Sequence, residues 1–276
     1  MNKPHLLEKH VGKLVTSMGA FIPGERVVFR GQNLHTTLKD LNWVELYLFA
    51  ITGRHFTANQ VDVIQALWCY TSYPDARIWN NRVAALAGSA RSTGTLGISA
   101  AMAVSEAKIY GRGVDLRASE FFRRIKKLVD AGKDLRKLVQ DELAQKRGIA
   151  GYGRPLVSKD ERIDPMIELI RERNLDDGPH LKIAFEVEKI LLEGRWRLHL
   201  NYAALAAALC ADFGMSSNEY YFASFMAFLA GMPPCFLDAS EKLEGQFLPL
   251  SCRMLSYEGV PNRSWQNKSY NVISSR

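Results

Sequence analysis

The residues best suited to holding a ligand lie near the middle of the chain. A short run there comprises Gly151, Tyr152, Gly153 and Arg154, and it is followed by Asp160, Glu161 and Arg162. Glycine lets a backbone pass close to a nucleotide and present N–H groups to phosphate oxygens. A guanidinium binds a carboxylate through two parallel hydrogen bonds. The segment predicts a site for an anionic ligand, with a tight turn between helices and a surface ion pair at Arg162 as the simpler alternatives.

The segments that must position these residues have helical patterns. Apolar side chains recur at intervals of three and four, and polar or glycine residues mark the ends. We expect helices over about 43–50, 57–67, 78–87, 96–108, 119–147, 163–173, 180–193, 203–213 and 218–229. The last of these should end at Gly231 and the two prolines that follow. The alanine-rich segment 203–211 is expected to be central. Extended structure is expected only in short runs such as 26–29, so the chain is predicted to be all-α.

The chain contains many basic and many acidic residues. The net charge is +7, and the segment 119–147 interleaves basic and acidic residues. Such mixing favours a solvated helix face over a nucleic-acid surface, which usually carries a purer basic stripe. The excess of basic residues suits an anionic small molecule. We therefore expect no nucleic-acid partner.

The composition is that of a globular protein with a sizeable core. The chain has 276 residues, of which 47% are hydrophobic. Its apolar runs fall short of the roughly 20 residues that a membrane-spanning helix needs, and no signal-peptide pattern opens the chain. The four cysteines lack the paired spacing of a metal site or disulfide framework. We expect a cytoplasmic protein with no membrane association and no metal.

Several segments, taken in order, resemble the citrate synthases and the shorter citryl-CoA lyase-like proteins. The resemblance covers roughly residues 27–260, and it rests on shared order because each motif is short. The matching segments are Val28 to Gln32, Trp43 to Leu48 with Thr52-Gly53, Arg82 to Ser89, Gly151 to Arg154, Asn201 to Met215, and Tyr257 to Gly259.

This resemblance implies an all-α fold with a large and a small subdomain. It divides the chain into an N-terminal extension (1–26), the citrate-synthase-like domain (27–260) with a small subdomain at about 115–215, and a C-terminal tail (261–276). It also implies a homodimer whose cleft brings an acyl-thioester and a carboxylated small molecule together. The loop 148–154 resembles the family's adenine-binding loop, so Gly151, Tyr152 and Gly153 are expected to contact coenzyme A.

The resemblance also implies that the catalytic residues have changed. The two catalytic histidines of the family fall on Tyr110 and Arg154, and its base aspartate falls on Ala203. A tyrosine donates hydrogen bonds, and an arginine stabilises an oxyanion but shuttles protons poorly. Alanine does neither. Loss of a general base costs about 10²- to 10⁴-fold in rate, so efficient citrate synthesis is not expected.

Three further residues are candidates for the altered site. His199 precedes Ala203 by four positions and is a candidate replacement base, with a packed or solvent-facing side chain as the alternative. Arg162 follows the family's "DPR" pattern and is expected to bind a substrate carboxylate, as is Arg253 near a late arginine of the family. Phe228 stands where the family has another substrate arginine, which makes one side of the pocket more apolar.

Two functions remain open. The first is an enzyme that forms, cleaves or rearranges a carbon–carbon bond in an acyl-thioester or carboxylated substrate, using Tyr110, Arg154 and His199. The second is a catalytically inactive paralogue that binds a ligand or supports a related subunit, which the alanine at position 203 favours.

Overall fold

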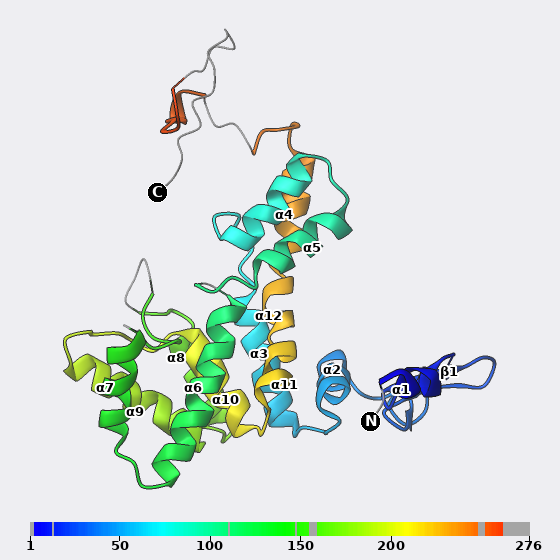
Figure 1. Cartoon of the computed structure of the whole chain (residues 1–276), viewed down its shortest axis with the longest axis horizontal. Helices are drawn as coiled ribbons and strands as arrows, with labels where there is room; N and C mark the ends of the chain where they lie inside the picture. Colours follow the sequence, from blue (N-terminus) through cyan, green and yellow to red (C-terminus); the bar gives the residue numbers. More distant parts are fainter. Residues whose placement is uncertain are drawn as a thin grey trace.

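The chain folds mainly into helices, as the sequence predicts. The computed structural model describes residues 3–12, 14–109, 111–146, 148–154, 159–247 and 252–261. Figure 1 shows their arrangement. The helices are α1 (Lys3–His10), α2 (Trp43–Thr52), α3 (Ala58–Thr71), α4 (Trp79–Ser89), α5 (Gly94–Val104), α6 (Arg112–Asp130), α7 (Leu135–Lys146), α8 (Ile163–Glu172), α9 (Pro179–Glu193), α10 (Tyr202–Asp212), α11 (Ser217–Ala223), α12 (Phe225–Leu229), α13 (Met232–Glu241) and the 3-10 turn η1 (Cys252–Met254).

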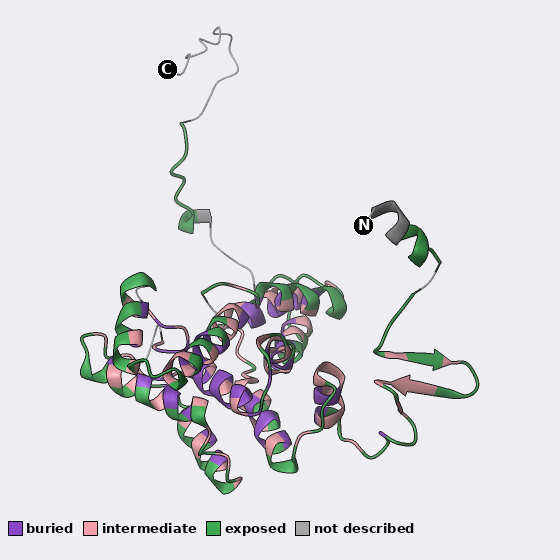
Figure 2. Ribbon diagram, turned by 60° about the horizontal axis from the view of Figure 1, so that its bottom comes forward, coloured by how far each residue is buried: buried purple, intermediate pink, exposed green. Residues whose placement is uncertain are grey.

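A small antiparallel sheet precedes the helical body. Its strands are β1 (Gly19–Ile22), β2 (Arg26–Phe29) and β3 (Gln32–Asn33), in that order, with Gly19 opposite Phe29. β2 is the extended run that the sequence predicts. The sheet extends across the predicted boundary at residue 27, and it lies to one side of the helices in Figure 2. Arg30 ties it to α2, because its Nε donates to the Ala50 carbonyl at 2.7 Å.

Local signals account for the ends of the first long helices. The side chains of Asn42 and Thr57 each accept a hydrogen bond from the backbone N–H three residues further along the chain. The side chain of that third residue in turn accepts a hydrogen bond from the backbone N–H of the cap residue. Such capping boxes satisfy N–H groups that a helix leaves unpaired. Gly53 ends α2 in the left-handed region with φ of 73°. These boundaries follow directly from the sequence.

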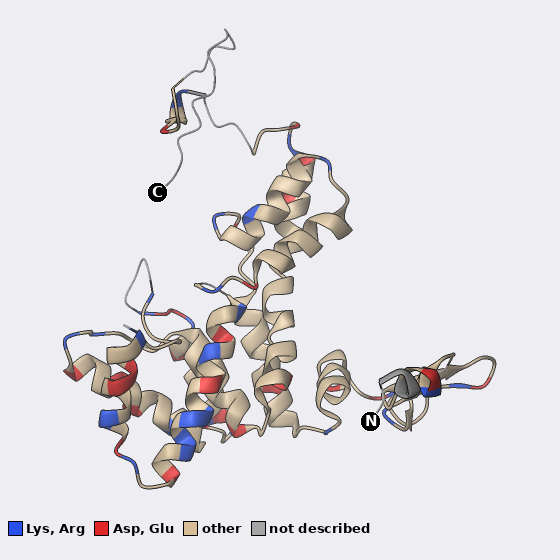
Figure 3. Cartoon of the chain, in the orientation of Figure 1, with Lys and Arg blue, Asp and Glu red and all other residues tan. Residues whose placement is uncertain are grey.

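The prediction of one helix over residues 119–147 is wrong. The structure has two, α6 and α7, and α6 begins earlier, at Arg112. The break falls at Gly132, whose φ of 78° is left-handed and ends a right-handed helix. An ion pair of 2.5 Å between Arg124 and Glu142 then joins the two helices. Figure 3 shows basic and acidic residues intermixed over this part of the surface.

The predicted helix over 218–229 ends at Leu229, close to Gly231 as expected, but it is divided into α11 and α12. Gly231 and the prolines that follow it also begin a further helix, α13, because Pro233 and Pro234 occupy its first turn, where a missing N–H costs nothing. The run Ser217–Glu241 is long and apolar enough to cross a membrane by length and composition. Here α11 packs on α6, α12 on α3 and α13 on α4, so the run extends through the whole body (Figure 1).

The core is built around α10. Eight of its eleven residues are buried, and α6 and α9 pack on it directly. Small alanine side chains let the neighbouring helices approach closely. Buried residues accordingly concentrate at the centre of Figure 2. This confirms the prediction of a central, alanine-rich helix.

Asp212 links the end of α10 to the start of α9. Its carboxylate accepts hydrogen bonds from the backbone N–H groups of His180 at 2.8 Å and Leu181 at 2.9 Å. Asp212→Ala should therefore lower the free energy of unfolding by about 1–2 kcal/mol, the range for a lost helix cap. Urea denaturation followed by circular dichroism measures the change.

Asp177→Ala is the matched control, because Asp177 is exposed in the loop before α9. We expect its unfolding midpoint to match that of the wild type. Equal stability of the Asp212 variant and this control would show that the cap contributes nothing.

Candidate functional site

One large pocket brings most of the predicted site residues together. Its volume is about 1210 Å³. It is lined by the end of α3, the start of α4, the first turns of α6, the loop 148–154, α10 and the α11–α12 segment. The positions named in the sequence analysis that line it include Gly151, Tyr152, Gly153, Arg154, Asp160, Arg162, Ala203 and Phe228. The loop therefore shares one cavity with Arg154 and Ala203, two of the positions at which the sequence resemblance predicts altered catalytic residues.

The loop 148–154 is bonded to the segment that starts α10. The Gly151 carbonyl accepts from the Asn201 N–H at 2.9 Å, and the Gly153 N–H donates to the His199 carbonyl at 2.7 Å. Gly151 has φ of 94°, and a Cβ there would lie 2.6 Å from the Cβ of Ala204. Gly151 is therefore required for packing against α10.

The expectation that this loop presents its N–H groups to phosphates needs correction at two positions. The Tyr152 N–H donates to the Ile149 carbonyl at 3.2 Å, and the Gly153 N–H is already bonded within the fold. The Tyr152 ring is buried, and its hydroxyl donates to the Ala184 carbonyl at 2.7 Å. Burial raises the pKa of this hydroxyl well above its usual value. The loop can therefore contact a ligand mainly because its glycines let the ligand lie close to the backbone.

A buried carboxylate organises the charged side of the pocket. Asp160 accepts hydrogen bonds from Arg162 Nε at 2.8 Å and Nη2 at 2.7 Å, and from the Tyr202 N–H at 3.0 Å. Burial alone would raise the pKa of Asp160, but the hydrogen bonds and charge of Arg162 outweigh it and hold the pKa below its usual value. Asp160 therefore remains ionised and fixes both the arginine and the first turn of α10.

Arg162 and Arg154 belong to one neutral cluster with Asp160 and Glu161. Arg162 is mostly buried, with its guanidinium 4.5 Å from the centre of the Tyr202 ring, so its ion pair is not at the surface. Nη1 of Arg162 forms no hydrogen bond with the described residues, so it is available to a ligand. Arg154 pairs with Glu161 and lies 3.8 Å from Asp160. Two cations and two anions leave little net charge to attract a tricarboxylate.

The remaining predicted residues lie elsewhere. The His199 side chain pairs with Glu188, at 3.2 Å from Nδ1 to Oε1, and does not line the pocket. Arg253 lies exposed in η1 and is not among the residues that line the pocket. Tyr110 lies outside the described residues. The structure therefore does not bring His199 or Arg253 to the candidate site.

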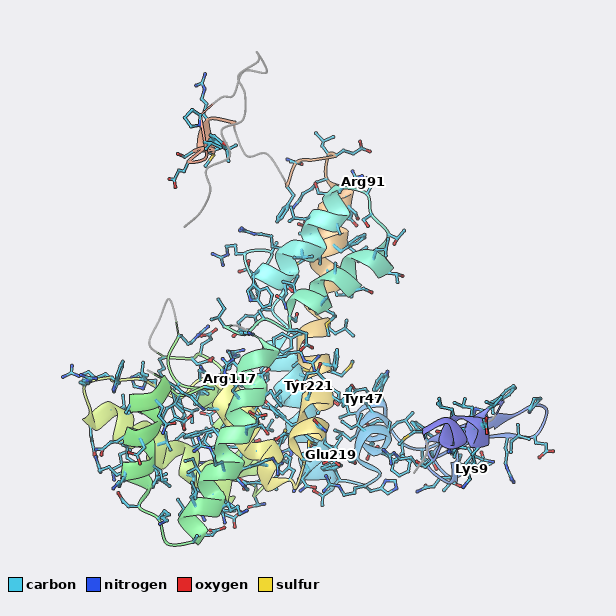
Figure 4. The ribbon with its side chains drawn as sticks, viewed as in Figure 1. Lys9, Tyr47, Arg91, Arg117, Glu219 and Tyr221 are labelled. Atoms are coloured by element: carbon cyan, nitrogen blue, oxygen red, sulfur yellow. The ribbon has the colours of Figure 1, made fainter. Side chains whose placement is uncertain are left out.

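Two of the charged lining residues that sequence reasoning missed come from α6. Asp115 and Arg117 lie on the first two turns of α6 and line the pocket. Arg117 is exposed, and the described residues provide it with no ion pair; Figure 4 labels it on the upper part of α6. Burial raises the pKa of Asp115 to about 7, although the charges of Arg112 and Arg162 oppose the shift. The sequence feature that could have identified Asp115 and Arg117 is their position just after Gly111 and Gly113.

Apolar side chains from three helices also line the pocket. They are Ala203 of α10, Ala223 of α11, and Ala227 and Phe228 of α12. Phe228 thus lies where the sequence predicted a more apolar side. Within the described ranges, no group of three or more His, Cys, Asp or Glu side chains is arranged to hold a metal ion. The pocket combines a polar side, a carboxylate of raised pKa and an apolar wall.

Three solved structures of similar fold are distant from this chain in sequence. Citryl-CoA lyase from Hydrogenobacter thermophilus matches with a TM-score of 0.79 at 18% identity, over 91% of this chain and 96% of that one. ATP citrate lyase from Methanothrix soehngenii, in complex with citrate and coenzyme A, matches with a TM-score of 0.73 at 15% identity, over 97% of this chain and 46% of that one. Citrate synthase from Thermoplasma acidophilum matches with a TM-score of 0.63 at 19% identity, over 81% and 58%.

Sequence comparison reaches the same family. No curated protein matches this chain. The family model described as the citrate synthase C-terminal domain, however, matches residues 4–232, which is most of the chain. The chain therefore belongs to the citrate synthase family.

Proposed function

We propose that this protein forms or cleaves a carbon–carbon bond at the α-carbon of a coenzyme A thioester. The observation that carries the proposal is the single pocket in which the loop 148–154, Arg154 and the first turns of α6 and α10 converge. Solved relatives of this fold include a citryl-CoA lyase and an ATP citrate lyase bound to coenzyme A. The proposal extends this ligand class to the present chain.

The proposed cleavage can be written with its electrons and protons balanced. The bond from the α-carbon to a hydroxyl-bearing carbon breaks, and its electron pair stays on the α-carbon as the thioester enolate. The hydroxyl passes its proton to a base in the pocket as that carbon becomes a ketone, and the enolate α-carbon then takes up a proton, so the ketone and the thioester form with no net change in protons. Arg154, and Tyr110 as its predicted companion, would donate to the oxygen on which charge develops. Condensation is the same step reversed.

The pocket favours a substrate less charged than citrate. Arg162 has one nitrogen left for a carboxylate, and the wall that includes Ala223 and Phe228 is apolar. We therefore propose a monocarboxylated or apolar partner for the thioester, and Arg117 as a contact to the anionic part of coenzyme A. A cytoplasmic homodimer is part of the same proposal.

Calorimetry with acetyl-CoA tests the ligand class. Arg117→Gln should weaken binding about 5- to 10-fold, which corresponds to about 1 kcal/mol for one exposed charge contact. Arg136→Gln is the control, because Arg136 pairs with Glu193 outside the pocket. Absence of measurable acetyl-CoA binding by the wild type would refute the proposal.

Turnover of citryl-CoA, or of acetyl-CoA with a panel of 2-keto acids, tests the reaction. Arg154→Ala should lower the rate about 10²- to 10³-fold, as when an oxyanion donor is removed, with little change in melting temperature because its ion pair is partly exposed. Full activity of this variant would rule Arg154 out. Binding without turnover in the wild type would instead support an inactive paralogue, for which Ala203 is the motivating observation.

A further inference from the structure

Asp115 is the carboxylate in the pocket that no structural role explains. It follows Gly111 and Arg112 in the first turn of α6 and is partly buried. Among the described residues, its side chain accepts no hydrogen bond and forms no ion pair, whereas Asp160 in the same pocket is bonded on both oxygens. The charged form of a carboxylate that is partly withdrawn from water and lacks partners is destabilised unless a ligand or a proton satisfies it. Asp115 is therefore available for chemistry.

Asp115 lies on the side of α6 that faces the cavity, close to α10. α6 packs directly against α10, and both Asp115 and Ala203 line the same cavity. Arg162, at the start of α8, and Arg112 interact with Asp115 through their charges. Cys210 on α10 and Tyr220 on α11 also lie within electrostatic range of it. Ala203 contributes only a methyl group to the cavity that it shares with Asp115.

The proposed reaction needs a group that exchanges protons with carbon. An enolate forms only if a base accepts the α-proton, and the reverse step needs an acid to return it. A group does both best when its pKa lies near the working pH. Burial raises the pKa of Asp115 to about 7, so both forms are populated at neutral pH. Arg154 is unsuited to this task because it stays protonated.

We propose that Asp115 is the general base that removes, and as an acid returns, the α-proton of the bound thioester. The C–H bond breaks, its electron pair moves into the C=C bond of the enolate, negative charge goes to the thioester oxygen, and the proton goes to an Asp115 oxygen. This inference rests on the proposed thioester function. It differs from the sequence-based assignment of His199, which lies outside the pocket.

Deuterium incorporation into acetyl-CoA in D2O tests this role without a second substrate. Nuclear magnetic resonance of the acetyl methyl group should show exchange catalysed by the wild type, and Asp115→Asn should slow it by at least about 10²-fold. Calorimetry on the same samples should show acetyl-CoA bound equally by both. Asp130→Asn, an exposed carboxylate on the same helix, should exchange at the wild-type rate.

Thermal stability gives a second readout that separates catalysis from a folding defect. The folded-state pKa of Asp115 lies above the unfolded value of about 3.9, so the wild type loses stability as pH rises from about 4 to 7. Asp115→Asn has no such loss. We expect it to melt at least about 2 °C above the wild type at pH 8, with a smaller difference at pH 4.

The outcomes separate the two proposals. Exchange by Asp115→Asn at the wild-type rate would overturn the assignment of Asp115. Binding of acetyl-CoA by the wild type without exchange would overturn it too, while leaving the coenzyme A site standing. No binding by the wild type would overturn the proposed function and this inference together.

Discussion

Asp160→Ala is expected to be the most damaging single substitution, lowering the free energy of unfolding by about 3–5 kcal/mol, the cost of breaking a buried ion pair. The change removes both acceptors of the Arg162 guanidinium, which is itself mostly buried, and the acceptor of the Tyr202 N–H. The charge of Arg162 would be left uncompensated. Guanidinium denaturation at pH 7 measures the loss.

Asp164→Ala is the matched control, four residues along the chain. Its carboxylate pairs with Lys159, and both side chains are about two-thirds exposed. Exposed pairs contribute about 0–1 kcal/mol, so this variant should unfold close to the wild type. A loss below 1 kcal/mol for Asp160→Ala would mean that Arg162 finds another partner or is solvated.

The pH dependence of stability provides a check on the same prediction. The folded-state pKa of Asp160 is lowered, so its contribution is present above the unfolded pKa of about 3.9 and is lost as pH falls through the folded value. The difference in stability between wild type and Asp160→Ala should therefore shrink below pH 4. A constant difference across pH would point to packing alone.

Gly151→Ala is expected to cost about 2–5 kcal/mol. A left-handed backbone costs a non-glycine residue about 1–2 kcal/mol, and overpacking of a tight contact adds about 1–3 kcal/mol. The new Cβ would lie 2.6 Å from the Cβ of Ala204 and 2.9 Å from its Cα, on a helix that cannot retreat from the core. Differential scanning calorimetry should show a melting temperature lowered by roughly 5 °C or more.

Gly148→Ala, in the same loop, separates these effects from a general need for glycine. No atom lies within 4 Å of the position that its Cβ would occupy, and its φ is not positive. We expect its melting temperature to equal or slightly exceed that of the wild type. Similar destabilisation of both variants would show that loop flexibility, and not contact with Ala204, sets the requirement at position 151.

Features encoded by neighbouring residues were predictable from the sequence. Thr57 and Gly53 mark helix ends through their own side chain or backbone conformation. The alanines of α10 identify a central helix because their size limits what can pack there. The split at Gly132 was missed because the apolar spacing continues across it, and the start of α13 was missed because proline both ends and begins helices.

Features that depend on tertiary contacts were not predictable. The unpaired state of Asp115 depends on α8, α10 and α11, so no local pattern distinguishes it from other acidic residues of α6. His199 was chosen for its distance from Ala203 along the chain, but Glu188 on α9 holds its ring outside the pocket. Arg162 was expected to meet a ligand, and Asp160 was not expected to be its main partner.

An antiparallel β-bridge between Tyr152 and Leu200 couples the pocket loop to the folded core. The pocket loop and the strand-like entry to α10 cannot separate without exposing Leu200 and Tyr152, both nearly fully buried. Ligand binding and unfolding of the core are therefore coupled. A ligand at 100 times its Kd would add about 2.7 kcal/mol to the free energy of unfolding. Stability in the cell would then rise and fall with metabolite supply.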